Sequence, residues 1–96
     1  MAIRIDPEVM RTRAGQFRSE AERIQEVISN MDNLLSNLQS EWEGNASQSY
    51  AARYTSEFKP NLQGAQEMVV EIASALDKVA QNMQEQDQVL AQAMGA

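Results

Sequence analysis

The sequence of 96 residues contains no cysteine and no histidine, and each absence excludes a class of chemistry. Without cysteine the chain forms no disulfides and offers no thiol nucleophile. Without histidine it lacks a common ligand of zinc and the side chain that most often acts as a general base near neutral pH. We therefore expect no metal site and no cofactor.

The remaining candidates for catalysis are carboxylates close together in the sequence, at Glu20, Glu22 and Glu26 and at Glu41 and Glu43. Most of them fall on outward-facing rows of a predicted helix, and no loop forms a pocket that would desolvate them. Such residues are better explained as a solvated helix face. The sequence therefore predicts a protein that is not an enzyme.

Positive charge is also scarce in this chain. Lysine and arginine number 8 against 14 aspartate and glutamate residues, so the net charge is -6. This sign is unfavourable for binding phosphate backbones, and we expect no nucleic-acid partner. No apolar run approaches the roughly 20 residues that span a bilayer, and the N-terminal stretch lacks the apolar region of a signal peptide. We expect no stable membrane insertion and, if the protein is secreted, export without a cleavable signal peptide.

Proline and glycine are few, which favours long helices. Asp6 followed by Pro7 is typical of a helix start, with the carboxylate as cap and proline at the first helical position. From there apolar residues recur at alternating steps of four and three up to Trp42, which predicts an amphipathic helix over about residues 7–41. The members that we expect in the core or at a dimer face are Phe17, Ile24, Ile28, Met31, Leu35 and Leu38. A polar row between them is expected to point outward and consists of Arg11, Arg18, Gln25, Asp32 and Gln39.

A hinge is predicted at residues 42–45. Gly44 suits the left-handed conformation that ends many helices, and Asn45 followed by Gln48 resembles a capping pair that begins the next helix. The second helix is expected over about residues 46–94, with a kink near Pro60 because proline removes a backbone hydrogen bond. Its expected core or dimer positions again follow steps of four and three and are Phe58, Leu62, Val69, Ile72, Leu76 and Val79.

These elements predict an all-α fold, a single domain over residues 1–96 in which two helices form an antiparallel helix-turn-helix hairpin. The apolar stripes are wider than one neighbouring helix can cover, since Val27, Leu34, Met68 and Ala75 lie beside the regular seam. A lone hairpin would leave these side chains in water. We therefore expect two hairpins to dimerise into a four-helix bundle.

The second helix is predicted to extend past the first. Counted from the hinge, residues 81–96 have no helix beside them and form an overhang. Met83, Asp87, Leu90 and Met94 lie on one helical face, because they follow one another at steps of four, three and four. An apolar stripe with one acid and no partner is typical of a docking helix, and a frayed glutamine-rich tail is the alternative.

The tripeptide Trp42-Glu43-Gly44 at the middle of this short chain resembles the WXG-100 family, the small proteins exported by type VII secretion systems of Gram-positive bacteria and mycobacteria. The resemblance covers the whole chain. It implies a secretion motif at Trp42 and Gly44 and a C-terminal export signal whose pattern is matched by Met83, Asp87, Leu90 and Met94. Mycobacterial members usually have tyrosine at the position of Met83, so this chain is more similar to the firmicute branch.

The resemblance also implies partners and a location. Firmicute members commonly form homodimers, so we expect a homodimer, with a heterodimer formed with a sister WXG protein as the alternative. The secretion ATPase would then recognise the hinge of one chain together with the tail of its partner. The protein is expected to be made in the cytoplasm and secreted to the cell envelope or beyond, as a virulence-associated effector or an escort. A cytosolic coiled-coil adaptor or chaperone is the alternative function.

Overall fold

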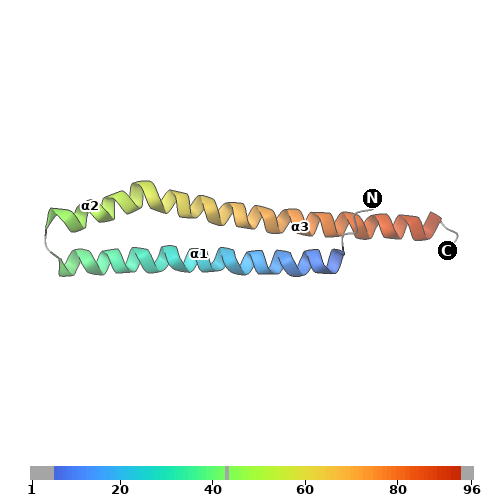
Figure 1. Ribbon diagram of the computed structural model, residues 1–96, viewed down its shortest axis with the longest axis horizontal. Coiled ribbons are helices and arrows are strands. Elements are labelled where there is room, and N and C mark those ends of the chain that lie inside the picture. Colours follow the sequence, from blue (N-terminus) through green and yellow to red (C-terminus); the bar gives the residue numbers. More distant parts are fainter. Residues whose placement is uncertain (1–5, 43, 94–96) are drawn as a thin grey trace. The chain divides into compact units, whose positions relative to one another are not determined.

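The computed structural model describes residues 6–42 and 44–93, with side chains as far as Asp87. Four helical elements follow one another, namely α1 (Pro7–Glu41), α2 (Asn45–Arg53), a π-helical turn η1 (Tyr54–Phe58) and α3 (Lys59–Ala93) (Figure 1). No strand occurs in these described ranges. The predicted all-α helical hairpin is confirmed, whereas the association of two hairpins stays a prediction.

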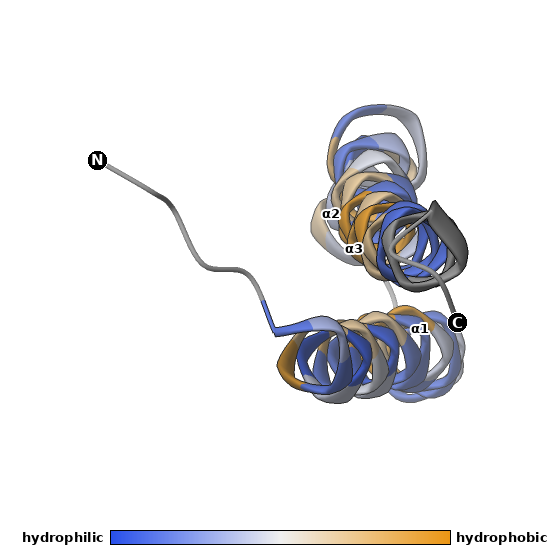
Figure 2. Ribbon diagram, turned by 90° about the vertical axis from the view of Figure 1, so that its right-hand side faces the viewer, coloured by the Kyte–Doolittle hydropathy of each residue, from blue (hydrophilic) through white to orange (hydrophobic). Residues whose placement is uncertain are grey.

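Contacts within the chain group into two compact units. We call Met1–Ser19 with Val69–Ala96 the terminal unit and Glu20–Met68 the hinge unit. Each unit contains a segment of α1 and a segment of the returning chain. Hydrophobic residues gather on one side of each helix while the rest of its surface is hydrophilic, as expected for helices that pack in pairs (Figure 2).

The start of α1 follows from its sequence. An Asp6 carboxylate oxygen accepts a hydrogen bond from the backbone N–H of Glu8 at 2.9 Å, which satisfies one of the free donors of the first turn. Pro7 is the first helical residue, where its missing N–H removes no hydrogen bond. The predicted cap at Asp6 is confirmed.

Small residues form the core of the terminal unit. Ala14, Ala73 and Ala80 are fully buried. Larger apolar side chains such as Phe17 and Leu76 flank them and are only half-buried. Alanine at the contact lets two helix axes approach closely, because the distance between packed helices depends on the side chains between them.

Polar contacts connect the two helices of the terminal unit. The Arg18 guanidinium pairs with the Asp77 carboxylate, and Arg11 donates a hydrogen bond to the side-chain oxygen of Gln84 at 2.6 Å. The prediction that Arg11 and Arg18 point outward is wrong. Both positions border the buried seam, and an arginine side chain is long enough to reach across to the neighbouring helix.

The hydrogen bond between Arg11 and Gln84 also corrects the predicted start of the overhang. Residues from Gln81 onward were expected to have no helix beside them, yet α1 lies beside α3 as far as Gln84. The count from the hinge assumed a regular α-helix. Arginine and glutamine side chains are both long, and the count did not allow for their reach along the helices.

Larger side chains fill the core of the hinge unit. Ile28 is 2% exposed and Tyr54 is 6% exposed, and the Tyr54 hydroxyl donates to the backbone carbonyl of Ile28 at 3.5 Å. Lys59 Nζ pairs with the Asp32 carboxylate at 2.9 Å, so Asp32 also departs from the predicted outward row. This hydrogen bond raises the pKa of Lys59, because it stabilises the ammonium form.

The kink predicted near Pro60 corresponds to the π-helical turn η1. The backbone N–H of Lys59 donates to the carbonyl of Tyr54, five residues earlier. Proline has no N–H, and its ring crowds the carbonyl four residues before it, here that of Ser56. A wider turn relieves this crowding, and the ribbon changes direction there (Figure 1).

Candidate functional site

The hinge depends on an unusual backbone conformation at Gly44. This residue has φ 146° and ψ 165°, a combination that is open essentially only to glycine. A Cβ atom added there would have no atom within 4 Å, so the backbone angle and not lack of space requires glycine. The sequence predicted a left-handed residue that ends α1. Gly44 is instead an extended residue with positive φ that immediately precedes α2.

Ser47 fastens the hinge and was missed by the sequence analysis. Its side chain is 2% exposed, and its hydroxyl lies 2.9 Å from the carbonyl oxygen of Trp42 and 3.1 Å from that of Gly44. The predicted capping pair of Asn45 and Gln48 is wrong, since α2 begins at Asn45 and has no side-chain cap. A serine three residues after the hinge glycine was the signal available in the sequence.

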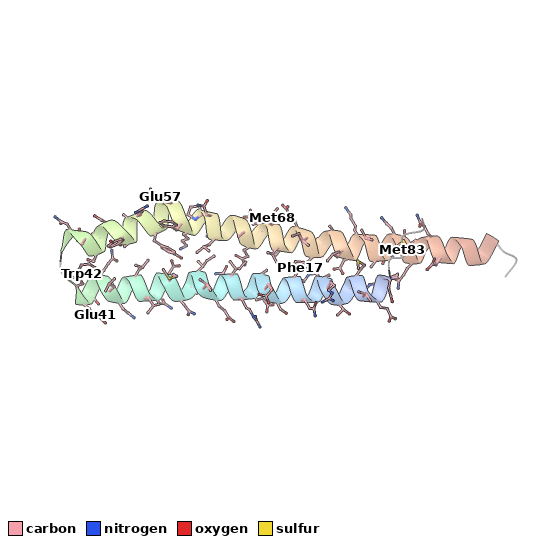
Figure 3. All side chains as sticks on the ribbon, viewed as in Figure 1. Phe17, Glu41, Trp42, Glu57, Met68 and Met83 are labelled. Atoms are coloured by element: carbon pink, nitrogen blue, oxygen red, sulfur yellow. The ribbon has the colours of Figure 1, made fainter. Side chains whose placement is uncertain are left out.

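Trp42 lies at the turn that follows α1 (Figure 3). Its backbone N–H donates to the backbone carbonyl of Leu38 at 2.8 Å, which extends the hydrogen-bond pattern of α1 by one residue. The Trp42 side chain remains 42% exposed. The sequence placed Trp42 at the end of a core stripe, and in the single chain much of this indole is available for a partner.

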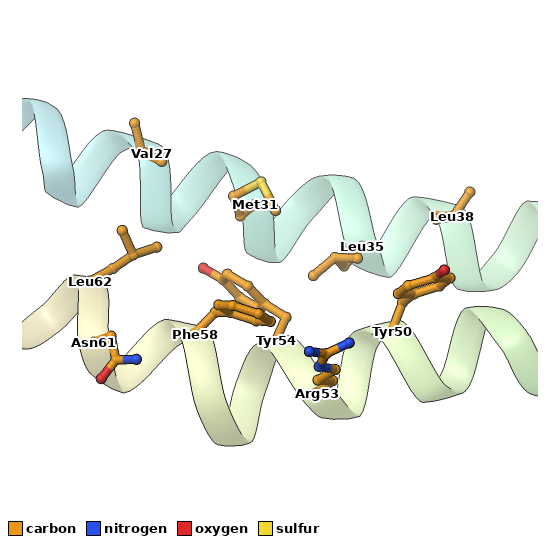
Figure 4. A pocket seen from close by; sticks show the side chains of 10 residues that line it. All are labelled: Val27, Met31, Leu35, Leu38, Tyr50, Arg53, Tyr54, Phe58, Asn61 and Leu62. Carbon is orange, nitrogen blue, oxygen red and sulfur yellow. The ribbon is translucent and has the colours of Figure 1, made fainter.

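An apolar groove of about 760 Å³ opens on the hinge unit (Figure 4). One wall comes from α1, and the other comes from α2, η1 and the first turn of α3. Tyr50 is 61% exposed and Phe58 48% exposed, although both side chains are large and apolar. The lining residues are Val27, Met31, Leu35, Leu38, Tyr50, Arg53, Tyr54, Phe58, Asn61 and Leu62.

A charged side chain lies against an aromatic residue that lines this groove. The Arg53 guanidinium carbon lies 5.4 Å from the centre of the Phe58 ring, within the range of a cation–π interaction. The same guanidinium pairs with Glu57 at 3.1 Å. Arg53 thus places a guanidinium that is paired with Glu57 at the edge of a mainly apolar groove.

The hinge geometry and the position of Trp42 and Gly44 agree with a comparison against known families. The family model described as "Proteins of 100 residues with WXG" matches residues 2–88. The chain belongs to the WXG100 family.

WXG100 relatives cover nearly the full length of this chain. Protein YukE of Bacillus subtilis is 28% identical over 89 residues, which are 93% of this chain and 91% of YukE. The type VII secretion system extracellular protein A of Staphylococcus aureus is 24% identical over 93 residues, 97% of this chain and 95% of that protein. Both relatives are from firmicutes, the branch that the sequence resembled.

Solved WXG100 structures share the fold. EsxA of Geobacillus thermodenitrificans superimposes with a TM-score of 0.85 at 28% identity and covers 95% of this chain and 97% of its own. The secreted protein EsxB of Bacillus anthracis gives a TM-score of 0.80 at 22% identity, with 91% of this chain and 98% of EsxB covered.

The predicted export signal lies in α3. Met83 is half-buried and Asp87 is exposed. Leu90 belongs to α3, its side chain lies beyond the described ones, and Met94 lies outside the described residues. The hinge residues Trp42 and Gly44 belong to the hinge unit, whereas these positions belong to the terminal unit.

The predicted core residues of the WXG100 chain divide by exposure. Ile28 is buried, and seven others are half-buried, namely Phe17, Ile24, Met31, Leu35, Leu62, Val69 and Leu76. Four are exposed in the single chain, namely Leu38, Phe58, Ile72 and Val79. Alanines occupy the most buried places, and the bulky residues at their flanks remain partly free to contact a partner.

Two kinds of feature are absent from residues 6–42 and 44–93, which the structure describes. None of the helices there is both long and apolar enough to cross a membrane. Within the same part of the chain, no three acidic residues are grouped in a way that would hold a metal ion.

Proposed function

We propose that this WXG100 protein is a substrate of a type VII secretion system and is exported as a folded homodimer. The observation that carries the proposal is the Trp42 to Gly44 hinge, placed between two helices in a chain that the family model matches over residues 2–88. A relative of nearly equal length is named a type VII secretion system extracellular protein. The proposed role of the present chain is protein–protein interaction and not catalysis.

The signal for export is proposed to have two parts. One part is the hinge with Trp42 and Gly44, where the indole is 42% exposed. The other is formed by Met83 and Asp87 of α3, together with Leu90 and Met94, which complete the export pattern in the sequence. In an antiparallel pair of hairpins the hinge of one chain lies near the tail of the other. The secretion ATPase would then bind both parts only on an assembled dimer.

Dimerisation is supported by the apolar surface that the single chain leaves uncovered. Val27 is 49% exposed, Leu34 61% and Met68 62%. Side chains of this size are expected to lose contact with water when the protein reaches its stable assembly. Light scattering at micromolar concentration should give twice the mass of one chain. A well-folded monomer would contradict the homodimer.

The export proposal is tested by comparing culture supernatant and cell pellet in strains with and without the secretion ATPase. Wild-type protein should appear in the supernatant only when the ATPase is present. Asp87→Ala should change the free energy of unfolding by less than about 0.5 kcal/mol, because Asp87 is an exposed residue. The same variant should remain in the pellet. Trp42→Phe should keep the fold and lower export.

The control is Gln86→Ala, which removes an exposed polar side chain from the same turn of α3 and should be exported normally. Normal secretion of both Asp87→Ala and Trp42→Phe would contradict the two-part signal. Wild-type protein that stays in the pellet of the ATPase-positive strain would favour the cytosolic adaptor or chaperone.

A further inference from the structure

We propose that Tyr54 and Lys59 are positioning residues for the hinge, because their contacts to α1 prevent the returning chain from sliding along that helix. Tyr54 donates to the backbone carbonyl of Ile28 at 3.5 Å, and Lys59 Nζ pairs with the Asp32 carboxylate at 2.9 Å. We call these two interactions the crossed contacts. All four residues belong to the hinge unit, so the inference concerns one unit of one chain.

The first of the crossed contacts reaches away from the hinge. The two helices of the hinge unit run in opposite directions, and Tyr50 lies across the groove from Leu38 (Figure 4). Tyr54 follows Tyr50 by four residues, so its backbone stands opposite about residue 34 of α1. Its hydroxyl nevertheless contacts Ile28, farther from the hinge, and its ring points away from Tyr50 (Figure 4). Sliding of the returning chain toward the hinge would lengthen this contact.

The second of the crossed contacts reaches in the opposite direction. Leu62 lies across the groove from Val27 (Figure 4), and Lys59 precedes Leu62 by three residues. The backbone of Lys59 therefore stands opposite about residue 30, whereas its partner Asp32 is nearer the hinge. Sliding away from the hinge would lengthen this ion pair. A slide of one residue, about 1.5 Å, takes one of the two contacts beyond hydrogen-bond distance.

The π-helical turn η1 makes both crossed contacts possible. Residues five apart in a regular α-helix differ in direction by about 140°, so Tyr54 and Lys59 would not both face α1. In η1 the backbone N–H of Lys59 donates to the carbonyl of Tyr54, and this wider turn brings the two residues to the same side. Pro60 favours the wider turn, since its ring would crowd the carbonyl of Ser56 in a regular helix.

The helix α2 connects the crossed contacts to the hinge. It runs from Asn45 to Arg53, directly between Gly44 and η1. A helix has a fixed rise per residue, so a displacement at η1 moves the start of α2 by the same amount. There the Ser47 hydroxyl lies 2.9 Å from the carbonyl oxygen of Trp42, and a slide of one residue would break this hydrogen bond. The crossed contacts therefore hold the conformation of the hinge from the far end of α2.

Hydrogen exchange distinguishes a positioning role from a general contribution to stability. Tyr54→Phe removes the hydroxyl and leaves the ring in the core, and Lys59→Gln removes the ammonium group. In the variant with both changes, the backbone amides of α2 and of Trp42 should exchange roughly two- to tenfold faster than in the wild type, as expected when a hydrogen bond is lost. Amides of the terminal unit should exchange at the wild-type rate.

The matched control is Tyr50→Phe with Lys78→Gln, which makes the same chemical changes at two exposed positions. Its amides should exchange as in the wild type throughout the chain. Equal exchange rates at the hinge for the variant and this control would overturn the proposal. An acceleration of the same size in both units would also overturn it, because it would indicate a loss of global stability.

A covalent link in place of the ion pair tests the restraint directly. The chain has no cysteine, so Asp32→Cys with Lys59→Cys provides the only two thiols. Without a linker, the hinge amides of this variant should exchange as fast as those of Lys59→Gln. After reaction with a short bis-maleimide, the species that migrates as one chain on a denaturing gel should recover the wild-type rate. Fast exchange at the hinge of the linked species would overturn the proposal.

The consequence for export rests on the proposed function. Because the hinge with Trp42 and Gly44 is one part of the proposed signal, Tyr54→Phe with Lys59→Gln should be secreted less than its control at equal amounts in whole cells. Absence of wild-type protein from the supernatant would contradict the proposed function and would not affect the exchange result. Equal secretion of the variant and its control, with the wild type exported, would overturn the positioning role in export.

Discussion

The terminal unit and the hinge unit bury different kinds of side chain. Ala14, Ala73 and Ala80 are fully buried in the terminal unit, and cross-helix polar pairs close to them fix one helix against the other. Tyr54 is buried in the hinge unit, and a groove of about 760 Å³ remains open beside it. Small residues on a regular helix thus give a closed contact. Aromatic residues on a widened helix give a contact and leave an apolar groove open beside it.

The largest effect should come from emptying the core of the hinge unit. Tyr54→Ala removes a buried ring and should lower the free energy of unfolding by roughly 3–5 kcal/mol, as for other large-to-alanine changes in cores. Urea unfolding followed by circular dichroism at one fixed protein concentration measures this loss. The control is Tyr50→Ala, at a ring that is 61% exposed in the single chain. Equal losses for the two variants at concentrations below dimerisation would show that Tyr54 is not a core residue.

Overpacking the terminal unit should have the next largest effect. Ala73→Leu inserts three carbon atoms where two helices approach closely and should cost about 1–3 kcal/mol in the free energy of unfolding. Ala52→Leu makes the same change at an exposed position of α2 and should be nearly neutral. The difference between the two urea midpoints tests the alanine core. A neutral Ala73→Leu would mean that the helices separate easily in this unit.

The hinge serine should contribute a smaller amount. Ser47→Ala leaves the carbonyl groups of Trp42 and Gly44 without their hydroxyl partner and should cost roughly 1 kcal/mol. Ser49→Ala, at an exposed position two residues further along α2, serves as the comparison. Amide hydrogen exchange near the hinge should accelerate in Ser47→Ala alone. An unchanged rate of amide hydrogen exchange would mean that Gly44, and not Ser47, stabilises the hinge.

The smallest effect is the pH dependence of the Lys59 pair. The hydrogen bond with Asp32 raises the pKa of Lys59 above its ordinary value of 10.5. Its contribution is therefore complete below pH 10.5 and is lost as the pH rises through the higher pKa of the folded protein. The melting temperatures of wild type and Lys59→Gln should differ slightly at neutral pH and converge in strong alkali. A difference that persists there would mean that the ammonium charge is not its source.

Much of the fold could be predicted because helix signals are local. The cap at Asp6, the start at Pro7 and the steps of four and three depend on neighbours within a few residues. The size of the seam residues was harder to interpret. Bulky apolar residues were assigned to the core, whereas alanines take the most buried places because only they fit where two helices come closest.

The hinge and the groove were less predictable from sequence. Trp42 and Gly44 marked the place of the turn, but the angles of Gly44 and the hydrogen bonds of Ser47 depend on how the two helices meet. Pro60 predicted a kink in the second helix. Its form as a π turn depends on Tyr54 and Lys59 both contacting α1, a tertiary constraint that no local pattern contains.

The half-exposed Trp42 is an intrinsic fluorescence probe of the hinge. It is the only tryptophan among 96 residues, so the indole fluorescence of the protein comes from one site at the hinge. An indole that is 42% exposed emits from a partly aqueous environment, and its spectrum moves to shorter wavelength when a partner covers it. Any binding event at the hinge can therefore be followed in real time on the unmodified protein, without a label that would disturb the surface under study.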